Sequence, residues 1–162
     1  MSRRRKVVMA IASVLVVILA VVDLLLVDAV RDDRREAEAK QEAMRGAREL
    51  VPVLLSYDHK TLGDDLAHAR EATTGKFRDD FDELVASVVR PTATERRVRT
   101  SAVVSAAGVI SSTSPDRVAV LVFVTQTSSS SVQKSPVVTG SRVKVLMAKK
   151  AGRWLIAGLD PV

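Results

Sequence analysis

"RVAVLVFVTQT", residues 117–127, is the stretch that decides the fold. Valine recurs at every second position, and the positions between are apolar too: Val118, Val120, Val122 and Val124 alternate with Ala119, Leu121 and Phe123. A short apolar run rich in β-branched residues is typical of a strand. Because neither face of this strand is polar, we expect it at the centre of a sheet.

Three further segments with strand-like composition surround it, at about 97–110, 137–149 and 152–159. Polar or turn-forming residues separate the strands: Ser114 to Asp116, Ser128 to Ser131, and Lys150 to Gly152. Arg142 and Lys144 alternate with apolar residues, as in a strand with one face in water. The short connections favour an antiparallel meander of four strands.

Helical patterns precede the strands. Apolar residues at i, i+4, i+7, i+8 and i+11 predict a helix: Phe77, Phe81, Leu84, Val85 and Val88. A shorter helix is predicted around Leu62, Leu66 and Ala69, and Pro91 is expected to end the longer one. Helices followed by a meander indicate an α+β domain, with the helices packed on one face of a four-stranded antiparallel sheet.

The N-terminal region differs in character. Residues 1–6 hold a basic cluster, and residues 7–27 are an apolar run whose one charged residue is Asp23. At about 1.5 Å per residue, this run spans the ~30 Å hydrocarbon core of a bilayer. A cleavable signal peptide and a buried core helix are the alternatives, but the run is longer than a signal peptide's apolar region and apolar all round. We interpret it as an uncleaved transmembrane anchor.

The flanking charges predict the orientation of the anchor. Basic residues next to a membrane span stay in the cytoplasm. We therefore expect residues 1–6 on the cytoplasmic side of the cell membrane and residues 28–162 on its outer side. The chain has no cysteine, so the extracytoplasmic domain is expected to fold on its core alone. An intramembrane carboxylate is costly to leave unpaired, which makes Asp23 a candidate contact with another membrane helix.

Residues 28–50 are predicted to continue the anchor as a helical stalk, because no Gly or Pro precedes Gly46. Two interpretations of this stalk stay open: a solvated helix, or a helix that packs on a partner's juxtamembrane helix. Pro52 lacks an amide donor and is expected to kink the helix. The α+β domain is therefore assigned to residues 51–162.

The net charge of +6 does not indicate nucleic-acid binding. Residues 3–6 supply four of these charges, and the remainder is dispersed among carboxylates. With one Trp, one Tyr and three Phe, the chain lacks a basic stripe interleaved with aromatic residues. We therefore expect a membrane partner and no nucleic acid.

The segment "SYDH" around Tyr57 raises the question of catalysis. Neighbouring residues in a helix point about 100° apart, so Tyr57, Asp58 and His59 cannot converge on one reacting atom. The structural interpretation is a corner between two helices. Thr61 would be the N-cap and Asp64 the third residue of a capping box, while Asp58 satisfies free amides and Tyr57 lays its ring on the core.

The sequence contains no other motif that carries chemistry. His59 and His68 are nine residues apart, off one helical face, and neither a Gly-rich phosphate loop nor a G-x-S-x-G motif occurs. We therefore predict no catalytic, cofactor-binding or metal-binding residues. Phe77, Phe81 and Trp154 are predicted to anchor the core.

Several short motifs occur in a characteristic order: Leu54-Leu55-Ser56-Tyr57-Asp58, Thr61-Leu62, Asp65-Leu66, Thr74-Gly75-x-Phe77, Leu121-Val122-Phe123-Val124-x-Gln126, and Gly152-Arg153-Trp154-Leu155 before Leu159-Asp160-Pro161-Val162. Together with the anchor, they make the chain resemble the Mce-associated membrane proteins of actinobacteria. Pro52, His59 and Phe81 depart from the pattern. The resemblance implies that residues 51–162 form a cone-like, nuclear-transport-factor-2-like domain.

The resemblance also implies a function: a non-enzymatic accessory or scaffold protein of an Mce-type lipid import system, with transporter subunits or the permease as partners. Two alternatives are similar in fold. One is an assembly scaffold of the type IV secretion kind, and the other is a ketosteroid-isomerase-like enzyme or apolar-ligand-binding domain. Strand positions facing the cone would be Val, Ala, Leu and Met, which suit a packed core or an apolar lipid ligand.

Overall fold

The computed structural model describes residues 33–162. The predicted tail at 1–6, the predicted anchor at 7–27 and Asp23 lie outside these residues. Within 33–162, no helix is both long and apolar enough to cross a membrane. The chain divides into two compact units, Met1–Ala37 and Glu38–Val162, and the fold below is that of the second unit.

Residues 33–55 are helical, and the helix passes through Pro52 without ending there. Its buried side chains recur every three or four residues: Ala39, Ala43, Ala47, Val51 and Leu54. Such a stripe is the packing face of a helix, and most of it belongs to the same core as the sheet. The helix predicted at 28–50 is thus present over residues 33–50, and from Ala43 onward one side of it packs on the sheet of its own chain.

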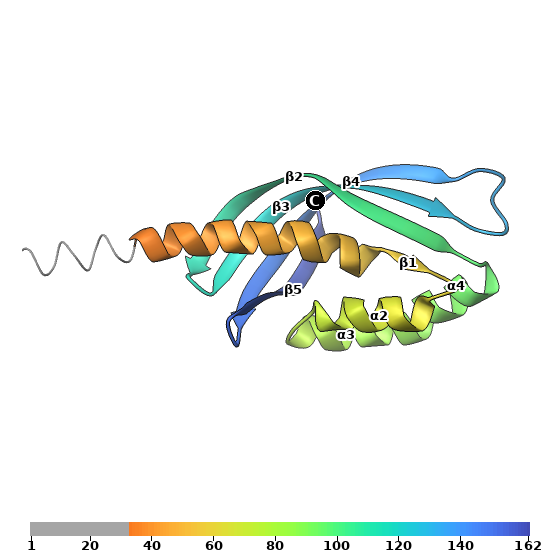
Figure 1. The fold of residues 1–162 in the computed structure, drawn as a ribbon, viewed down its shortest axis with the longest axis horizontal. Helices are drawn as coiled ribbons and strands as arrows, with labels where there is room; N and C mark the ends of the chain where they lie inside the picture. The colour runs from red at the N-terminus through yellow and green to blue at the C-terminus, as the bar shows by residue number, and fades with distance from the viewer. Residues whose placement is uncertain (1–32) are drawn as a thin grey trace, which may run out of the picture. The chain divides into compact units, whose positions relative to one another are not determined.

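Shorter elements follow this helix (Figure 1). They are β1 (Tyr57–Asp58), α2 (Leu62–Glu71), α3 (Lys76–Leu84), the π-helical segment η1 (Val85–Val89) and α4 (Arg90–Glu95). The prediction that Pro91 ends the helix is wrong. The amide of Arg90 bonds the carbonyl of Val85, five residues back, and this wider turn lets the proline ring enter the first turn of α4.

The sheet has five strands in the order β1-β2-β3-β4-β5, with every neighbouring pair antiparallel. The long strands are β2 (Arg99–Ser114), β3 (Arg117–Ser129), β4 (Val137–Lys150) and β5 (Arg153–Pro161). This confirms the α+β class, the meander and the central place of β3. The predicted count of four strands is wrong, because Tyr57 and Asp58 add a short edge strand beside Thr100 and Arg99.

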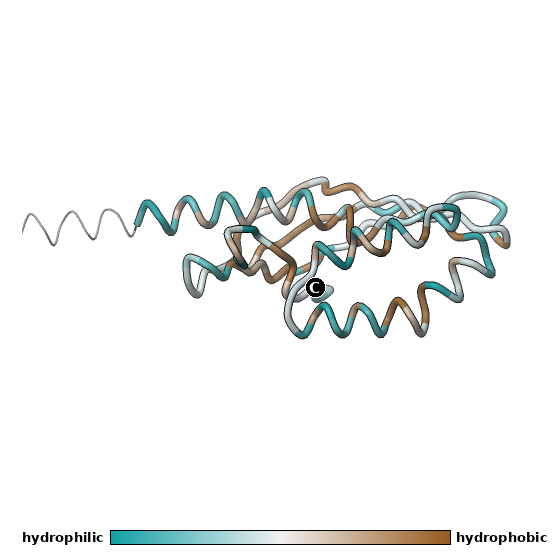
Figure 2. Tube along the Cα trace, turned by 60° about the horizontal axis from the view of Figure 1, so that its bottom comes forward, coloured by the Kyte–Doolittle hydropathy of each residue, from teal (hydrophilic) through white to brown (hydrophobic). Residues whose placement is uncertain are grey.

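The side chains of the sheet alternate between an inner face, toward the helices, and an outer face, away from them. The inner face is buried and apolar: Val118, Val120, Val122, Val124, Val143, Val145, Met147 and Ile156. It forms one core with the helix at 33–55, and Ala69, Phe77 and Phe81 of α2 and α3 pack against it. Figure 2 shows the long hydrophobic stretches along the strands and more hydrophilic turns along the helix.

The two edges of the sheet, β5 and the part of β2 beyond β1, are protected in different ways. The loop between α2 and α3 covers β5, since Ile156 N–H donates to the Ala72 carbonyl at 2.8 Å and Thr74 N–H donates to the Ile156 carbonyl at 2.9 Å. Beyond its two residues paired with β1, strand β2 has three register shifts against β3. Bulges of this kind twist an edge strand and discourage further pairing.

Candidate functional site

Tyr57 and Asp58 lie at a corner that is held by hydrogen bonds and an ion pair. Asp58 accepts a hydrogen bond from the Lys60 N–H at 2.9 Å, and the Arg99 guanidinium lies 3.5 Å from its carboxylate. Tyr57 is partly buried against a small second core formed by α2, η1 and α4. The corner thus ties strand β1 to β2 and to the start of α2.

The capping box predicted from Thr61 and Asp64 is not formed. Thr61 makes no side-chain cap to the helix, and Asp64 is exposed. The next residue, Asp65, closes the corner instead: its Oδ2 accepts the Thr61 hydroxyl at 2.7 Å and the Asp58 N–H at 2.9 Å. Tyr57 and Asp58 are extended rather than helical, and the backbone amide of Asp58 therefore finds its acceptor in Asp65.

His59 lies beside Asp58 at the corner. Its Nδ1 lies 3.1 Å from Asp58 Oδ1, an ion pair when the imidazole is protonated. The Lys60 N–H, helped by the charges of His59 and Arg99, lowers the pKa of Asp58. This carboxylate is therefore a poor general base at neutral pH. Among the described residues, no group of three His, Asp or Glu side chains could hold a metal ion.

Trp154 lies where β5 meets the helix at 33–55, half-buried rather than at the centre of the core. Its Nε1 donates to Glu42 Oε2 at 3.0 Å, and the Lys149 ammonium donates to the same oxygen at 2.8 Å. The Lys149 nitrogen is also 5.7 Å from the centre of the indole ring. The hydrogen bond from Lys149, and after it the one from Trp154, lowers the pKa of Glu42. The cluster fastens the helix to the sheet.

The outer face of the sheet carries exposed apolar side chains. Strand register places Ala106, Phe123 and Arg142 side by side on it, followed by Gly108, Leu121 and Lys144. Phe123 is 40% exposed and Leu146 is 41% exposed, whereas Val122, between Leu121 and Phe123, is fully buried. The outer face therefore combines apolar, small and cationic side chains.

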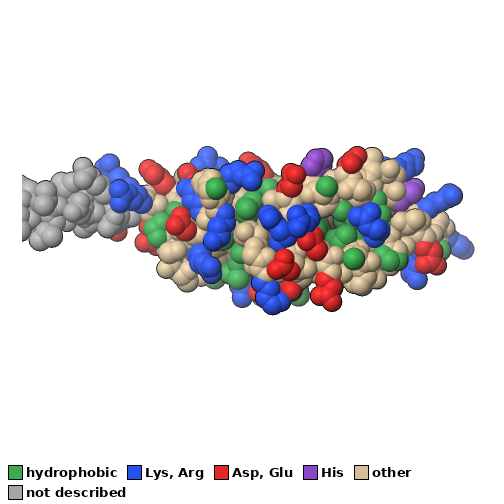
Figure 3. Space-filling view, turned by 90° about the horizontal axis from the view of Figure 1, so that it is seen from below, with side chains coloured by type: hydrophobic (Ala, Val, Ile, Leu, Met, Phe, Trp, Pro, Cys, Tyr) green, Lys and Arg blue, Asp and Glu red, His purple; other side chains and the backbone are tan. Residues whose placement is uncertain are grey.

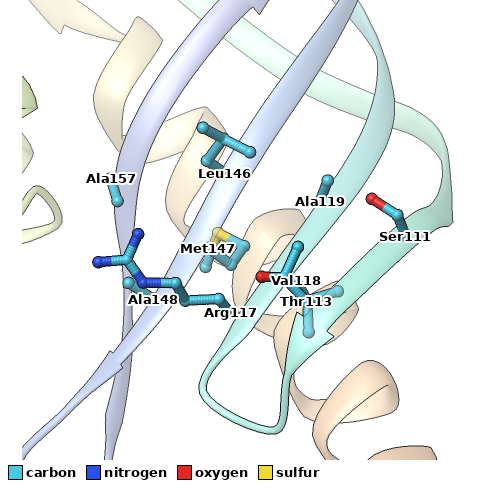
Figure 4. A pocket seen from close by; sticks show the side chains of 9 residues that line it. All are labelled: Ser111, Thr113, Arg117, Val118, Ala119, Leu146, Met147, Ala148 and Ala157. Carbon is cyan, nitrogen blue, oxygen red and sulfur yellow. The ribbon is translucent and has the colours of Figure 1, made fainter.

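Two hollows lie on this face. One, of about 270 Å³, has Leu146, Ala119 and Ala157 beside Arg117 and Ser111 (Figure 4). The other, of about 550 Å³, is lined by Phe123, Arg142, Ser105 and their neighbours. Within residues 33–162, neither Arg117 nor Arg142 has an acidic partner within ion-pair distance, whereas Lys144 has Asp160 at 3.4 Å. Each hollow thus offers a free guanidinium next to apolar surface.

Charge separates the sheet from the helices. The four long strands carry seven cationic residues and one acidic residue, Asp160: Arg99, Arg117, Arg142, Lys144, Lys149, Lys150 and Arg153. Residues 62–95 carry eight acidic and four basic residues. Figure 3, seen from below the view of Figure 1, shows mixed charges with small hydrophobic spots between them. The net positive charge outside residues 3–6 is thus concentrated on the sheet.

Sequence reasoning did not identify this surface. Alternation of Arg142 and Lys144 with valines did predict a wet face on β4. For β3, however, an apolar second face suggested only a central position. Which of the two faces the helices cover depends on strand register, and the register is not readable from β3 alone.

The chain matches, over residues 5–160, the family described as "Uncharacterized protein Rv1363c/MT1408-like". Outer membrane protein Rv1973 of Mycobacterium tuberculosis is 39% identical over 134 residues, covering 83% of this chain and 81% of that protein. Rv1362c of the same organism is 36% identical over 131 residues, covering 81% of this chain and 59% of its own length. None of these descriptions names an Mce-associated protein.

Solved structures with a similar fold include type IV secretion proteins and a periplasmic domain. An IcmL-like type IV secretion protein of Legionella pneumophila superposes with a TM-score of 0.62 at 10% identity, over 74% of this chain and 88% of that one. VirB8 of Agrobacterium tumefaciens gives 0.59 at 13% identity, over 77% and 92%. The periplasmic domain of DotI gives 0.61 at 14% identity, over 74% and 91%.

At such low identities these likenesses establish the fold and nothing more. The fold shared with VirB8-type domains agrees with the expected class, whereas the likeness to nuclear transport factor 2 stays a prediction. The match over residues 5–160 and the identity to the mycobacterial relatives extend along most of the chain. The protein therefore belongs to the Rv1363c/MT1408-like family.

Proposed function

We propose that this protein is a non-enzymatic, membrane-associated scaffold whose extracytoplasmic domain helps to assemble a membrane machine. The observation that carries the proposal is the outer face of the sheet. Phe123, Leu146, Arg117 and Arg142 are exposed on it, although the other face of the same strands is packed. Within residues 33–162, no acidic side chain lies within ion-pair distance of either arginine. Exposed apolar surface beside charged groups is typical of interaction sites.

A binding role suits the described residues better than catalysis does. The inner face, which would line a cone, is filled by a continuous core of valines, Met147 and Ile156. A ketosteroid-isomerase-like enzyme would need an acid and a base within that space. Turnover of a steroid by the purified protein, or a lipid that co-purifies with it, would favour the enzyme or ligand-binding alternative.

The proposed location combines two arguments. The basic cluster and apolar run at residues 1–27 predict a single-pass anchor with the domain outside the cytoplasm. A relative is described as an outer membrane protein, which supports membrane association. Fractionation separates the two membranes, and protease treatment of spheroplasts tests the orientation, since digestion of the domain is expected and its protection would contradict the proposal.

Two machines are candidates for the partner. The fold shared with VirB8-type and IcmL-like proteins supports a scaffold of the secretion kind, which we favour. The motif resemblance supports an Mce-type lipid importer as the second candidate. In either machine, Asp23 would meet a polar group of another membrane helix.

Co-purification of the tagged full chain in mild detergent, followed by mass spectrometry, tests the proposal. Secretion-type subunits would support the first candidate, and Mce proteins or their permease the second. The double variant Arg117→Glu/Arg142→Glu is expected to lose the partners, whereas Arg90→Glu, on α4, is expected to retain them. If the wild-type chain is recovered alone from native membranes, the scaffold proposal is wrong.

A further inference from the structure

A second exposed surface, on α3 and η1, has the opposite character to the outer face. Leu84 is 50% exposed and Val88 is 52% exposed, four residues apart on one side of the helix. Glu83 and Asp79 are exposed beside them. We call these four residues the acidic stripe. Apolar residues at this spacing normally face a core, and here they face solvent.

The outer face and the acidic stripe complement each other. Phe123 and Leu146 on the sheet offer apolar contacts to Leu84 and Val88, as Arg117 and Arg142 offer cations to carboxylates. The described contacts include no ion pair to Glu83 or Asp79, nor to either arginine. Complementary charges around an apolar centre favour a specific partner and suppress others.

One molecule cannot bring these two surfaces together. Helices α2 and α3 pack against the inner side of the sheet, through Ala69, Phe77 and Phe81. The outer face lies on the opposite side, as Figure 1 shows. A contact between the two surfaces must therefore join two copies, and it leaves one surface free at each end of the pair. Such head-to-tail contacts continue into a ring or an open row.

We propose that the outer face of the sheet is the docking site for the acidic stripe of a second copy of this chain, so that copies assemble head to tail. The inference rests on the proposed scaffold function and names the occupant of its surface. A membrane complex that assembles around such a row or ring would find several identical binding sites, one on each copy of the chain.

The expected contact is modest in size. Four strands at a spacing of about 4.8 Å and a shared length of roughly nine residues give a face of about 14 by 30 Å. This is below the ~800 Å² per partner of a standard stable interface. Assembly is therefore expected to need a high local concentration, such as the plane of a membrane provides, and to weaken with salt.

The test uses the full chain in mild detergent, with sedimentation velocity as the readout. The sheet variant is Arg117→Glu/Arg142→Glu and the stripe variant is Asp79→Lys/Glu83→Lys. The wild-type chain is expected to form species whose size grows with concentration, and each variant alone is expected to stay monomeric. In a mixture of the two variants, the acidic sheet of one meets the basic stripe of the other, and the native sheet of the second meets the native stripe of the first. Because both contacts are attractive again, the mixture is expected to form alternating species whose size grows with concentration.

Cysteine cross-linking gives an independent readout, because the natural chain has no cysteine. A mixture of Leu84→Cys and Leu146→Cys chains is expected to cross-link at least about tenfold more than Thr94→Cys with Leu146→Cys, since Thr94 is exposed on α4 away from the stripe. A monomeric wild-type chain, or a mixture of charge variants that does not associate, overturns the proposal. Partners that co-purify with a monomeric wild-type chain would preserve the scaffold function while refuting self-assembly.

Discussion

The inner and outer faces of the sheet differ although the same strands form both. In β3, Val118, Val120 and Val122 are buried, whereas Phe123 on the other side is 40% exposed. Both sets are apolar, so composition does not distinguish them. The helices cover one face only, and the difference teaches that an apolar residue in a strand marks either the core or an interaction surface.

The largest expected effect comes from neighbouring residues on the two faces. Val122→Asp places a charge in the packed core and is expected to cost at least about 4 kcal/mol, comparable with the stability of a small domain. Phe123→Asp is expected to change stability by less than about 1 kcal/mol. Urea unfolding followed by the fluorescence of the single Trp154 measures both. Similar losses for the two variants would show that the outer face is also covered.

The packing of the helix at 33–55 on the inner face of the sheet can be tested at Gly46. A Cβ at this position would lie 3.2 Å from the Cβ of Trp154 and 3.3 Å from Cε of Met147, whereas a Cβ at Gly63 would meet nothing within 4 Å. Gly46→Val is therefore expected to cost about 1–3 kcal/mol through overpacking. Gly63→Val is the matched control and is expected to be nearly neutral. Thermal unfolding compares the two, and equal melting temperatures would contradict close packing of the helix on the sheet.

The hydrogen bonds of Glu42 with Lys149 and Trp154 predict that the stability of the domain depends on pH. The pKa of Glu42 is lowered, mainly by hydrogen bonds from Lys149 and Trp154, relative to an ordinary value of 4.5. Its contribution to stability is thus complete above about pH 4.5 and declines as the pH falls toward the lower folded-state pKa. Glu42→Gln should be less stable than the wild type at pH 7, and the gap should narrow on acidification.

Urea unfolding between pH 7 and pH 3 measures this gap. Glu49→Gln is the control, because Glu49 lines a shallow hollow together with Glu42, Lys149 and Trp154 but accepts no hydrogen bond from Lys149 or Trp154 in the described chain. A gap that stays constant down to pH 3 would mean that Glu42 contributes no charge-dependent stability.

The smallest effects are expected at the corner, where the sheet passes from β1 to α2. Asp65→Ala removes an acceptor of two hydrogen bonds and should cost about 1 kcal/mol. Asp64→Ala, one residue earlier and exposed, should cost almost nothing, as should His59→Ala. A folded, abundant His59→Ala protein that has lost its function would revive a catalytic or ligand-binding role for this segment.

The sequence by itself determined the class, the meander and the place of β3. Periods of two and of 3.6 residues are local properties, and short polar connections leave few topologies for neighbouring strands. The same local logic succeeded at the turn between β4 and β5, where Ala151 and Gly152 adopt the positive φ angles of 47° and 79° that a tight hairpin uses. The absence of a reactive constellation in the sequence left scaffolding as the leading function.

Only the tertiary structure decided what each apolar surface packs against. The alanines of the helix at 33–55 give a weak hydrophobic signal, so their packing on the sheet was not predicted. Leu84 and Val88 follow the pattern of a buried stripe and are nevertheless exposed. Of the five positions in that pattern, Phe77, Phe81 and Val85 are the ones that pack in the cores. Burial depends on contacts between segments distant in sequence, and a periodic pattern records only that a face is apolar.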